Sequence, residues 1–307
     1  MKTQSRLEKI LSSGAIAVTS ECGPPRGALP EKVKEKAELL RHHVDAINVT
    51  DNQTAMVRMS SFAAAVIIKQ IGLDPVLQMV TRDRNRIAMQ SDVIGAYSHG
   101  INTMLCLSGD HPKFGDHPMA KGVFDLDSVQ LIQTIKKMRN EGKLQGDSDI
   151  EAPPKMFIGA AANPFADPFE LRVMRLAKKI KAGADFIQTQ CIFNLDKFEK
   201  WMAGVTDRGL DKKVHILAGI TPMKSAGMAR YMKNKVPGMD VPENIIKRLE
   251  SVKKEKQAQE GINIAVESIN RLKQVPGIHG FHIMAIEWEK KVPEIVEKAG
   301  LYPRPEI

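Results

Sequence analysis

The sequence predicts an α/β protein of the (β/α)8 TIM barrel type, and two regularities support this prediction. Eight short apolar runs recur along the 307-residue chain, and such runs are typical of strands buried on both faces of a parallel sheet. Segments with a helical apolar period separate the runs, as a barrel of about 250 residues requires. No break divides this pattern, so we expect residues 1–307 to form a single domain.

The eight apolar runs give the expected strands. In chain order they are residues 15–21, 46–51, 75–81, 103–110, 156–163, 185–193, 214–220 and 280–288. An open doubly wound sheet is the other arrangement of alternating strands and helices, and it needs a Gly-rich loop after the first strand. The segment ECGPPRG (21–27) has the wrong spacing for that loop and contains two prolines. The barrel is therefore the favoured arrangement.

The helices have recognisable starts and ends. Residues 1–14 read as a short N-terminal helix rather than a signal peptide, because charges interrupt the apolar positions. Further helices are expected at 29–44, with Pro30 in the first turn, at 127–142, with an Asp or Ser cap and a closing Gly142, and at 167–183. Residues 242–274 contain two helical stretches, which are extra helices before the last strand.

Composition argues against a nucleic-acid or membrane protein. The 45 basic and 36 acidic residues give a formal charge of +9, but the two kinds are intermixed and form no basic arm. A mild positive field suits an anionic small molecule. No apolar run approaches the about 18 residues of a membrane span. Three distant cysteines with no C-x-x-C pair indicate no local metal site and a reducing compartment, so we expect a cytoplasmic protein.

Polar residues end most of the expected strands. In a barrel of this type the active site is built at the C-terminal ends of the strands. The candidates at these ends are Glu21, Thr50, Asp51, Asn52, Gln78, Thr81, Arg82, Asp83, Gly109, Asp110, Asn163, Gln188, Gln190 and Glu287. We therefore expect a polar site at this end of the barrel.

Glu21 is the first of these candidates, because it ends an apolar run just before Gly23, Pro24 and Pro25. A carboxylate at a barrel mouth can serve as a general acid or base. The two prolines restrict the backbone behind it, so its position is held at little entropic cost. The alternative is an acid that pairs with a loop arginine such as Arg26.

Two further strand ends point to a ligand. Gly109 allows a ligand to approach the backbone closely, and Asp110 then offers an acceptor, although Gly-Asp is also a common turn. Gln188 and Gln190 lie on one face of their strand because strands have a period of two. A glutamine inside a barrel must be hydrogen-bonded, either to a heterocyclic ligand or to a neighbouring side chain.

Basic residues follow the fifth expected strand. Arg175, Lys178 and Lys179 lie on the helix at 167–183, where they can reach phosphate oxygens as charge-assisted donors. The alternative is that they form a solvated helix face.

Taken together, these segments resemble the methylenetetrahydrofolate reductase family over about residues 8–290. SECGPPRG (20–27) is similar to the family's first-strand motif, in which Glu precedes Pro-Pro. LSGD (107–110) is similar to its fourth-strand Gly-Asp, and AGITPM (218–223) to its seventh-strand motif. GADFIQTQCIFNLDKF (183–198) is the most specific match. The order of the motifs on successive strands makes the joint resemblance strong.

The resemblance implies a flavoprotein that reversibly reduces 5,10-methylenetetrahydrofolate to 5-methyltetrahydrofolate. It implies that Glu21 is the general acid that helps to open the five-membered ring to an iminium, and that flavin N5 delivers the hydride. Asp110 is implied near both flavin and pterin, and Gln190 in contact with the folate. The flavin-binding positions implied by the resemblance are Thr50, Gln78, Gly109, Asp110, Asn163, Lys178 and Lys179.

Departures from the family pattern concern the cofactor tail. FAD is the cofactor that the family implies. Ser108 replaces the usual Arg before Gly-Asp, and Gln78 stands where many members have His. Asn163 replaces an aromatic residue, Asp167 a His, and Arg172 an Asp that contacts the cofactor. These departures weaken the case for the adenine half of FAD and make FMN an alternative.

Other departures concern the electron donor. Ala226 stands where nicotinamide-using members have a stacking aromatic, and Trp288 stands where an Arg is expected. Tyr231 is expected elsewhere on the same helix, so we expect poor direct use of NADH or NADPH. Short family members that work with a zinc-containing partner subunit are more similar to this chain. An electron-transfer or zinc-containing partner and an oligomer are therefore expected.

Two alternatives remain open at this stage. One is a barrel enzyme for pterin or corrinoid methyl transfer, although the chain has no corrinoid-binding His motif. The other is a non-catalytic subunit of an electron-transfer complex. Such a subunit would not need Glu21, Asp110 and Gln190 at one barrel mouth.

Overall fold

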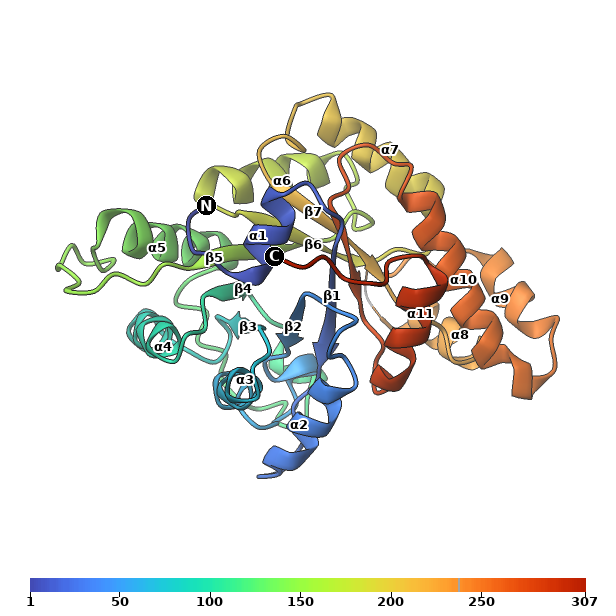
Figure 1. Cartoon of the computed structure of the whole chain (residues 1–307), viewed down its shortest axis with the longest axis horizontal. Helices are drawn as coiled ribbons and strands as arrows, with labels where there is room; N and C mark the ends of the chain where they lie inside the picture. Colours follow the sequence, from blue (N-terminus) through green and yellow to red (C-terminus); the bar gives the residue numbers. More distant parts are fainter. Residues whose placement is uncertain (237) are drawn as a thin grey trace.

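Eight parallel strands form a closed barrel in the computed structural model, which describes residues 1–236 and 238–307 (Figure 1). The strands pair in sequence order, and β1 also pairs with β8. The strands are β1 (Ala17–Cys22), β2 (Ala46–Val49), β3 (Pro75–Val80), β4 (Thr103–Leu107), β5 (Phe157–Ala162), β6 (Phe186–Cys191), β7 (His215–Ile220) and β8 (Gly280–Ile283). The predicted (β/α)8 barrel is thus confirmed.

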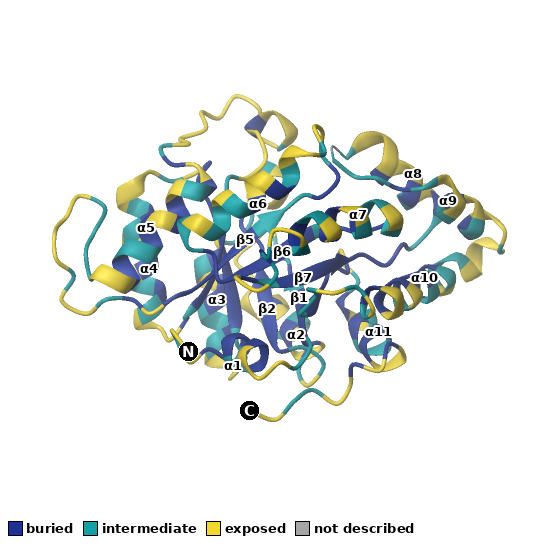
Figure 2. Cartoon of the chain, turned by 90° about the horizontal axis from the view of Figure 1, so that it is seen from above, coloured by how far each residue is buried: buried dark blue, intermediate teal, exposed yellow. Residues whose placement is uncertain are grey.

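Helices surround the barrel. They are α1 (Arg6–Ser12), α2 (Pro30–Glu38), α3 (Ser61–Gln70), α4 (Arg86–Ser98), α5 (Ser128–Glu141), α6 (Leu171–Ala182), α7 (Leu195–Thr206), α8 (Ala226–Lys235), α9 (Glu243–Glu250), α10 (Gln257–Leu272) and α11 (Val292–Lys298). The strands are almost wholly buried, whereas the helices expose their outer faces (Figure 2). No helix in the described part of the chain is long and apolar enough to cross a membrane.

Local signals explain several helix ends. Asp127 caps α5, and its carboxylate accepts a hydrogen bond from the backbone N–H of Gln130. In turn, the Gln130 side-chain oxygen accepts a hydrogen bond from the backbone N–H of Asp127. Gly142 closes the same helix with φ of 67°, a conformation that favours glycine. The two extra helices predicted within residues 242–274 are α9 and α10, and together with α8 they form one side of the molecule in Figure 1.

The last strand is shorter than the sequence predicts. The apolar run suggested residues 280–288, but β8 ends at Ile283. Its pairing with β1 and with β7 also ends there, so the ladder has no further partner. The chain then turns, and Glu287 adopts φ of 47°. Glu287 is consequently an exposed loop residue rather than a strand end.

Helix α1 closes the N-terminal end of the barrel. Leu7, Ile10 and Leu11 pack against the inward-facing residues at the starts of the strands, including Phe157 and Phe186. These two rings stack with centroids 5.1 Å apart. The C-terminal segment lies at the same end, where Arg304 pairs with Asp45 at 2.6 Å. The N-terminal half of the barrel interior is therefore an apolar core, and the opposite end remains for a site.

Replacing Ile10 by alanine is expected to lower the free energy of unfolding by about 2–5 kcal/mol. The substitution removes buried methyl groups and leaves a cavity between α1 and the barrel. Urea denaturation measures the change. Leu39→Ala is the control, because Leu39 is 45% exposed and its truncation should change stability by no more than about 0.5 kcal/mol. Equal losses of unfolding free energy in the two variants would contradict the conclusion that α1 closes the barrel.

Candidate active site

Two cavities meet at the C-terminal mouth of the barrel. The smaller one, of about 460 Å³, lies over the strand ends. The larger one, of about 780 Å³, extends between the loop after β2 and helix α8. Both volumes are in the range of small-molecule sites. Five residues line both cavities, namely Glu21, Gln53, Asp110, Gln190 and Met284. Three of the candidates from the sequence are thus brought together where the cavities join.

A layer of polar side chains lies inside the barrel below this junction. Asn48 and Gln188 exchange two amide hydrogen bonds, of 2.6 and 3.0 Å. Gln188 Nε2 also donates to Thr19 Oγ1 at 3.0 Å. All three residues are almost completely buried. Gln188 therefore bonds to neighbouring side chains, which was one of its two expected roles, and it needs no ligand to satisfy its amide.

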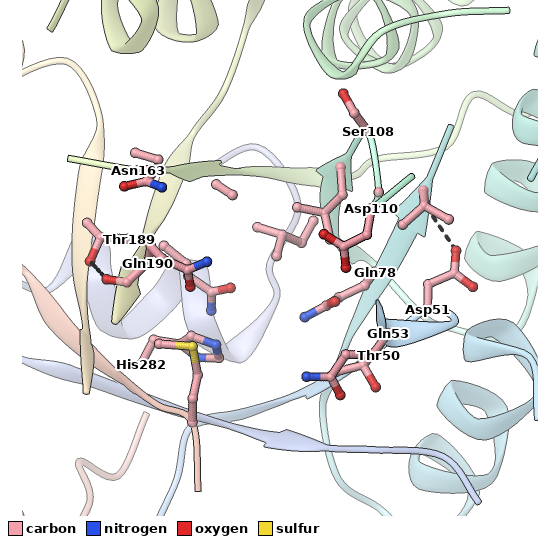
Figure 3. A pocket seen from close by; sticks show the side chains of 18 of the residues that line it. Thr50, Asp51, Gln53, Gln78, Ser108, Asp110, Asn163, Thr189, Gln190 and His282 are labelled. Carbon is pink, nitrogen blue, oxygen red and sulfur yellow. Dashed lines mark hydrogen bonds between the residues drawn. The ribbon is translucent and has the colours of Figure 1, made fainter. Parts of the chain in front are cut away.

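The layer continues to His282 and Glu21. Thr19 Oγ1, which accepts from Gln188, also forms a hydrogen bond of 2.9 Å with His282 Nδ1. The other ring nitrogen of His282, Nε2, lies 3.6 Å from Glu21 Oε1. Figure 3 shows His282 beside the pocket. A chain of polar groups thus leads from the barrel centre to the Glu21 carboxyl.

Glu21 is partly buried, with 18% of its side chain exposed. Arg26, the alternative partner suggested by the sequence, forms an ion pair with Asp116 instead. Among the described residues, His282 is the one basic side chain within ion-pair distance of Glu21. The carboxyl therefore faces both cavities with His282 as its neighbour.

Asp110 lies opposite Gln190 across the pocket (Figure 3). Gly109 before it has φ of 86°, and a Cβ at that position would lie 3.0 Å from Val80 Cβ. The glycine is therefore required for the loop to pass close to β3. Arg82 supports the loop, since its Nη1 donates to the carbonyl oxygen of Asp110 at 3.1 Å. The Asp110 carboxylate itself remains exposed to the cavities.

Gln190 occupies an irregular position in β6. The register between β6 and β7 shifts between Gln188 and Cys191, and such irregularities often re-aim a side chain next to a site. Thr189 Oγ1 donates to the Gln190 carbonyl at 3.0 Å and accepts from Gly219 N–H at 2.8 Å. The Gln190 amide group therefore reaches both cavities from a braced backbone.

Thr50, Gln78 and Asn163 all line the smaller cavity, as Figure 3 shows. Thr50 Oγ1 is buried and has no hydrogen-bond partner within residues 1–236 and 238–307. A buried hydroxyl without a partner is uncommon, so this group is available to a ligand. The Asn163 side chain already has a protein partner, because its Oδ1 accepts a hydrogen bond from Phe165 N–H at 2.9 Å.

The basic residues on α6 divide into two groups. Lys179 lines the smaller cavity, and its Nζ donates to the carbonyl oxygen of Ala161 at 2.6 Å. Burial, followed by the nearby charge of Arg175, lowers the pKa of Lys179 to about 8. Lys178 is exposed and lines neither cavity, unlike the position that the resemblance implied. Arg172 and Arg175 line the smaller cavity in its place.

Ala226 and Tyr231 lie on different faces of α8. Ala226 is only 3% exposed and lies in the core between α8 and its neighbours. Tyr231 lies elsewhere on the same helix, as expected, and lines the larger cavity. The packing of α8 determines which of its faces meets the cavity. Poor direct use of NADH or NADPH by this chain stays a prediction.

His282 is the main residue that the sequence reasoning missed. The signal lay in the run GFHIM (280–284), in which every second residue faces the barrel interior. A polar residue at an inward position is conspicuous in an otherwise apolar strand. Arg82, one of the residues expected at the end of the third strand, is 3% exposed, and the structure adds that it supports the Asp110 loop.

The fold and the mouth define the class of this protein as a (β/α)8 barrel with a ligand site at the C-terminal ends of its strands. The sequence profile described as methylenetetrahydrofolate reductase matches residues 6–300. The chain therefore belongs to the methylenetetrahydrofolate reductase family.

Relatives in this family differ in length. Methylenetetrahydrofolate reductase 2 of Schizosaccharomyces pombe is 28% identical over 219 residues, which cover 67% of this chain and 32% of that protein. The Saccharomyces cerevisiae protein of the same name is 27% identical, covering 80% of this chain and 40% of its own length. This chain thus spans well under half of those relatives. The 5,10-methylenetetrahydrofolate reductase of Salmonella typhimurium is 21% identical, with 94% and 93% covered.

Solved structures show the same fold at low identity. A Clostridium thermocellum protein described as binding two copies of 5-methyl-5,6,7,8-tetrahydrofolic acid is 13% identical, with a TM-score of 0.65. The alignment covers 95% of this chain and 99% of that protein. Oxaloacetate acetylhydrolase is 10% identical with a TM-score of 0.51, covering 92% and 81%. These likenesses concern the barrel alone.

Replacing Gln188 by leucine is expected to lower the free energy of unfolding by about 1–3 kcal/mol for each buried polar group left unsatisfied. Asn48 and Thr19 lose their partner in this variant. The double variant Gln188→Leu/Asn48→Leu is the matched control, because replacing both partners with apolar groups removes much of that cost. Denaturant titration compares the three proteins. A double variant less stable than Gln188→Leu would contradict this reading of the layer.

Proposed function

We propose that this chain is a flavin-dependent oxidoreductase that interconverts 5,10-methylenetetrahydrofolate and 5-methyltetrahydrofolate. The observation that carries the proposal is the junction of two cavities at Glu21, Asp110 and Gln190. Two ligands, one in each cavity, would meet at a proton donor, as a hydride-transfer reaction assisted by an acid requires. Membership of the methylenetetrahydrofolate reductase family supports the same chemistry.

The residues of the smaller cavity fit a flavin. Thr50 Oγ1 offers a buried hydroxyl that has no partner in the described chain, and Gln78 adds an amide at the same wall. The loop at Gly109 allows a flat ring to approach the backbone. Arg172, Arg175 and Lys179 provide cations for phosphate. A bound reduced flavin supplies a hydride, while the protein binds and orients the reactants.

The larger cavity suits the folate. Its lining combines apolar side chains of α8, including Met228 and Met232, with the aromatic rings of Phe114 and Tyr231. Such a surface can bind a pteridine and an aminobenzoyl group. Gln190 and Asp110 lie where the pterin edge would enter the junction, and each can hydrogen-bond to a ring nitrogen or amino group.

Glu21 is proposed to move the proton. The five-membered ring of the substrate opens when a nitrogen of the methylene bridge is protonated, because the C–N bond then breaks and leaves an iminium on the other nitrogen. The Glu21 carboxyl is positioned to donate this proton at the junction. His282 Nε2, 3.6 Å from Glu21 Oε1, orients the carboxyl and stabilises the carboxylate that remains. His282 is thus a positioning residue.

A second candidate is a folate-binding protein without redox chemistry. The structural neighbour from Clostridium thermocellum is described as binding two copies of 5-methyl-5,6,7,8-tetrahydrofolic acid, and this chain also has two adjoining cavities. Such a protein would bind two folates and no flavin. Two further alternatives are a methyl-transfer enzyme and a non-catalytic subunit of an electron-transfer complex. In either case, folate would leave the redox state of a bound flavin unchanged.

The deciding experiment is to load the purified chain with flavin, reduce it with an artificial donor and add 5,10-methylenetetrahydrofolate without oxygen. We expect the flavin absorbance to return as 5-methyltetrahydrofolate forms in equal amount. Binding of two folates per chain with no flavin bound would reject the reductase and support the second candidate. A bound flavin that stays reduced would also reject it.

Glu21→Gln is expected to slow the folate half-reaction by about 10²–10⁴-fold, the usual contribution of a general acid. Flavin binding and reduction of the flavin by its donor should change little, because the amide keeps the shape of the side chain. Stopped-flow absorbance measures the two half-reactions separately. Glu35→Gln, an exposed change on α2, is the control. A folate half-reaction at the unmodified rate would remove Glu21 from the mechanism.

Gln190→Ala is expected to weaken folate binding by about 1–3 kcal/mol, since a polar partner of the pterin is lost. Flavin content should be unchanged. Titration of the flavin-loaded protein with 5-methyltetrahydrofolate gives the dissociation constant, and Gln274→Ala, at an exposed site after α10, is the control. Normal folate affinity together with lost flavin would instead assign Gln190 to the cofactor.

A further inference from the structure

Arg82 joins two loops at the mouth of the barrel. Its Nη1 donates to the Asp110 carbonyl at 3.1 Å, and its Nη2 donates to the Asn52 carbonyl at 3.2 Å. The Arg82 side chain is 3% exposed, and Asp83 pairs with it at 2.6 Å. One buried cation thus holds the loop after β4 beside the loop after β2. From these two loops, Asp110 and Gln53 line both cavities.

The two loops also pack directly against each other. Gly115 lies so close to Ala55 that a Cβ on the glycine would be 1.8 Å from the Ala55 carbonyl oxygen. A glycine is therefore required at this crossing. As Figure 3 shows, Asp110 and Gln53 lie on one side of the pocket and Gln190 on the other. Asp110 and Gln53 are consequently held as neighbours on one wall of the junction.

The loop after β2 is strained around Gln53. Asn52, Thr54 and Ala55 have φ of 43°, 59° and 57°, in the left-handed region that residues other than glycine rarely adopt. The Asn52 side chain supports this conformation, since its Oδ1 accepts from Arg58 N–H at 3.1 Å. Strained residues persist only where surrounding contacts hold them, and they cluster at ligand sites. The strained loop therefore points to a role for the side chain that it carries into the junction.

The Gln53 amide is free to bind a ligand. It is exposed to the cavities and forms no side-chain hydrogen bond with any residue in 1–236 or 238–307. The amide of Gln190 on the opposite wall is partly engaged, because its Oε1 accepts from Cys191 N–H at 3.3 Å. Gln53 thus supplies an uncommitted N–H donor next to the acceptor oxygens of Asp110.

We propose that Gln53 is a specificity-determining residue that, together with Asp110, recognises the 2-amino-4-oxo edge of the substrate pterin. The proposal rests on the folate reaction proposed above. Along this edge the 2-amino group and N3–H are donors, and the 4-oxo oxygen beside them is an acceptor. The Asp110 carboxylate accepts from the two donors, since it has two acceptor oxygens and no proton to give. The amide NH2 of Gln53, on the same wall, donates to the 4-oxo oxygen.

This pairing selects the substrate by the order of its donors and acceptors. Two acceptors followed by a donor on the protein match two donors followed by an acceptor on the pterin. A ligand with a 4-amino group in place of the 4-oxo group breaks the match at Gln53, because two donors then face each other. Leaving such polar groups unpaired in a closed site is what separates similar ligands.

The test titrates the protein with 5-methyltetrahydrofolate in a calorimeter. Gln53→Ala is expected to weaken binding about tenfold, the effect of one lost hydrogen bond, and to leave the flavin content unchanged. Gln274→Ala, the same change at an exposed site, is the control. Equal affinities of Gln53→Ala and the control would overturn the proposal, as would lost flavin with normal folate affinity. Absence of folate binding by the unmodified protein would reject the folate function itself.

A second variant separates recognition from a general disturbance of the loop. Gln53→Glu places an acceptor where the proposal needs a donor, so it should repel the 4-oxo oxygen and attract a 4-amino group. We expect the ratio of the dissociation constants of 5-methyltetrahydrofolate and its 4-amino-4-deoxy analogue to shift at least about tenfold toward the analogue. A damaged loop or a changed cavity charge would weaken both ligands alike. An unchanged ratio would therefore overturn the proposal.

Kinetics distinguish Gln53 from the proposed proton donor Glu21. The contact of Gln53 is with the pterin edge and not with the methylene bridge, so it stabilises bound substrate and transition state alike. Gln53→Ala should raise the KM for 5,10-methylenetetrahydrofolate about tenfold and leave kcat nearly unchanged, whereas Glu21→Gln lowers kcat. A lower kcat with an unchanged KM in Gln53→Ala would place Gln53 in the chemical step and overturn its assignment to recognition.

Discussion

The hydrogen-bonded layer of Thr19, Asn48, Gln188 and His282 separates the apolar half of the barrel from its mouth. Polar groups in the centre of a barrel are costly unless they satisfy one another, and here each amide and hydroxyl finds a partner. Because these bonds link β1, β2, β6 and β8, they also hold the strand ends in position. The geometry of the site above depends on this layer.

The layer explains why Glu21 and Gln190 are available for chemistry. Thr19 and Glu21 lie two residues apart on β1, as Gln188 and Gln190 do on β6, so each pair faces the barrel interior. The lower member of each pair is engaged in the layer, whereas the upper member faces the junction of the cavities. His282 connects the two levels, because it contacts Thr19 through one ring nitrogen and faces Glu21 with the other.

Much of this arrangement could be predicted from the sequence. The apolar runs identified all eight strands, and the residues at their ends included Glu21, Thr50, Gln78, Asp110 and Gln190, which all line the cavities. Errors arose where orientation mattered. Lys178 and Lys179 are adjacent in sequence, yet the structure directs only Lys179 toward the cavity. On α8, Ala226 is buried whereas Tyr231 lines the larger cavity, because the packing of the helix determines which of its faces meets the site.

The sequence by itself determined the order of strands and helices, the strand ends that bear polar residues and the family. Those features follow from local periodicity and from motifs within single segments. Only the tertiary structure decided that Gln188 pairs with Asn48, that His282 faces Glu21, and that three cations of α6 share one cavity wall. Each of these contacts joins residues from different strands or places one helix face against the barrel. Such contacts depend on strand register and helix rotation, which no single segment encodes.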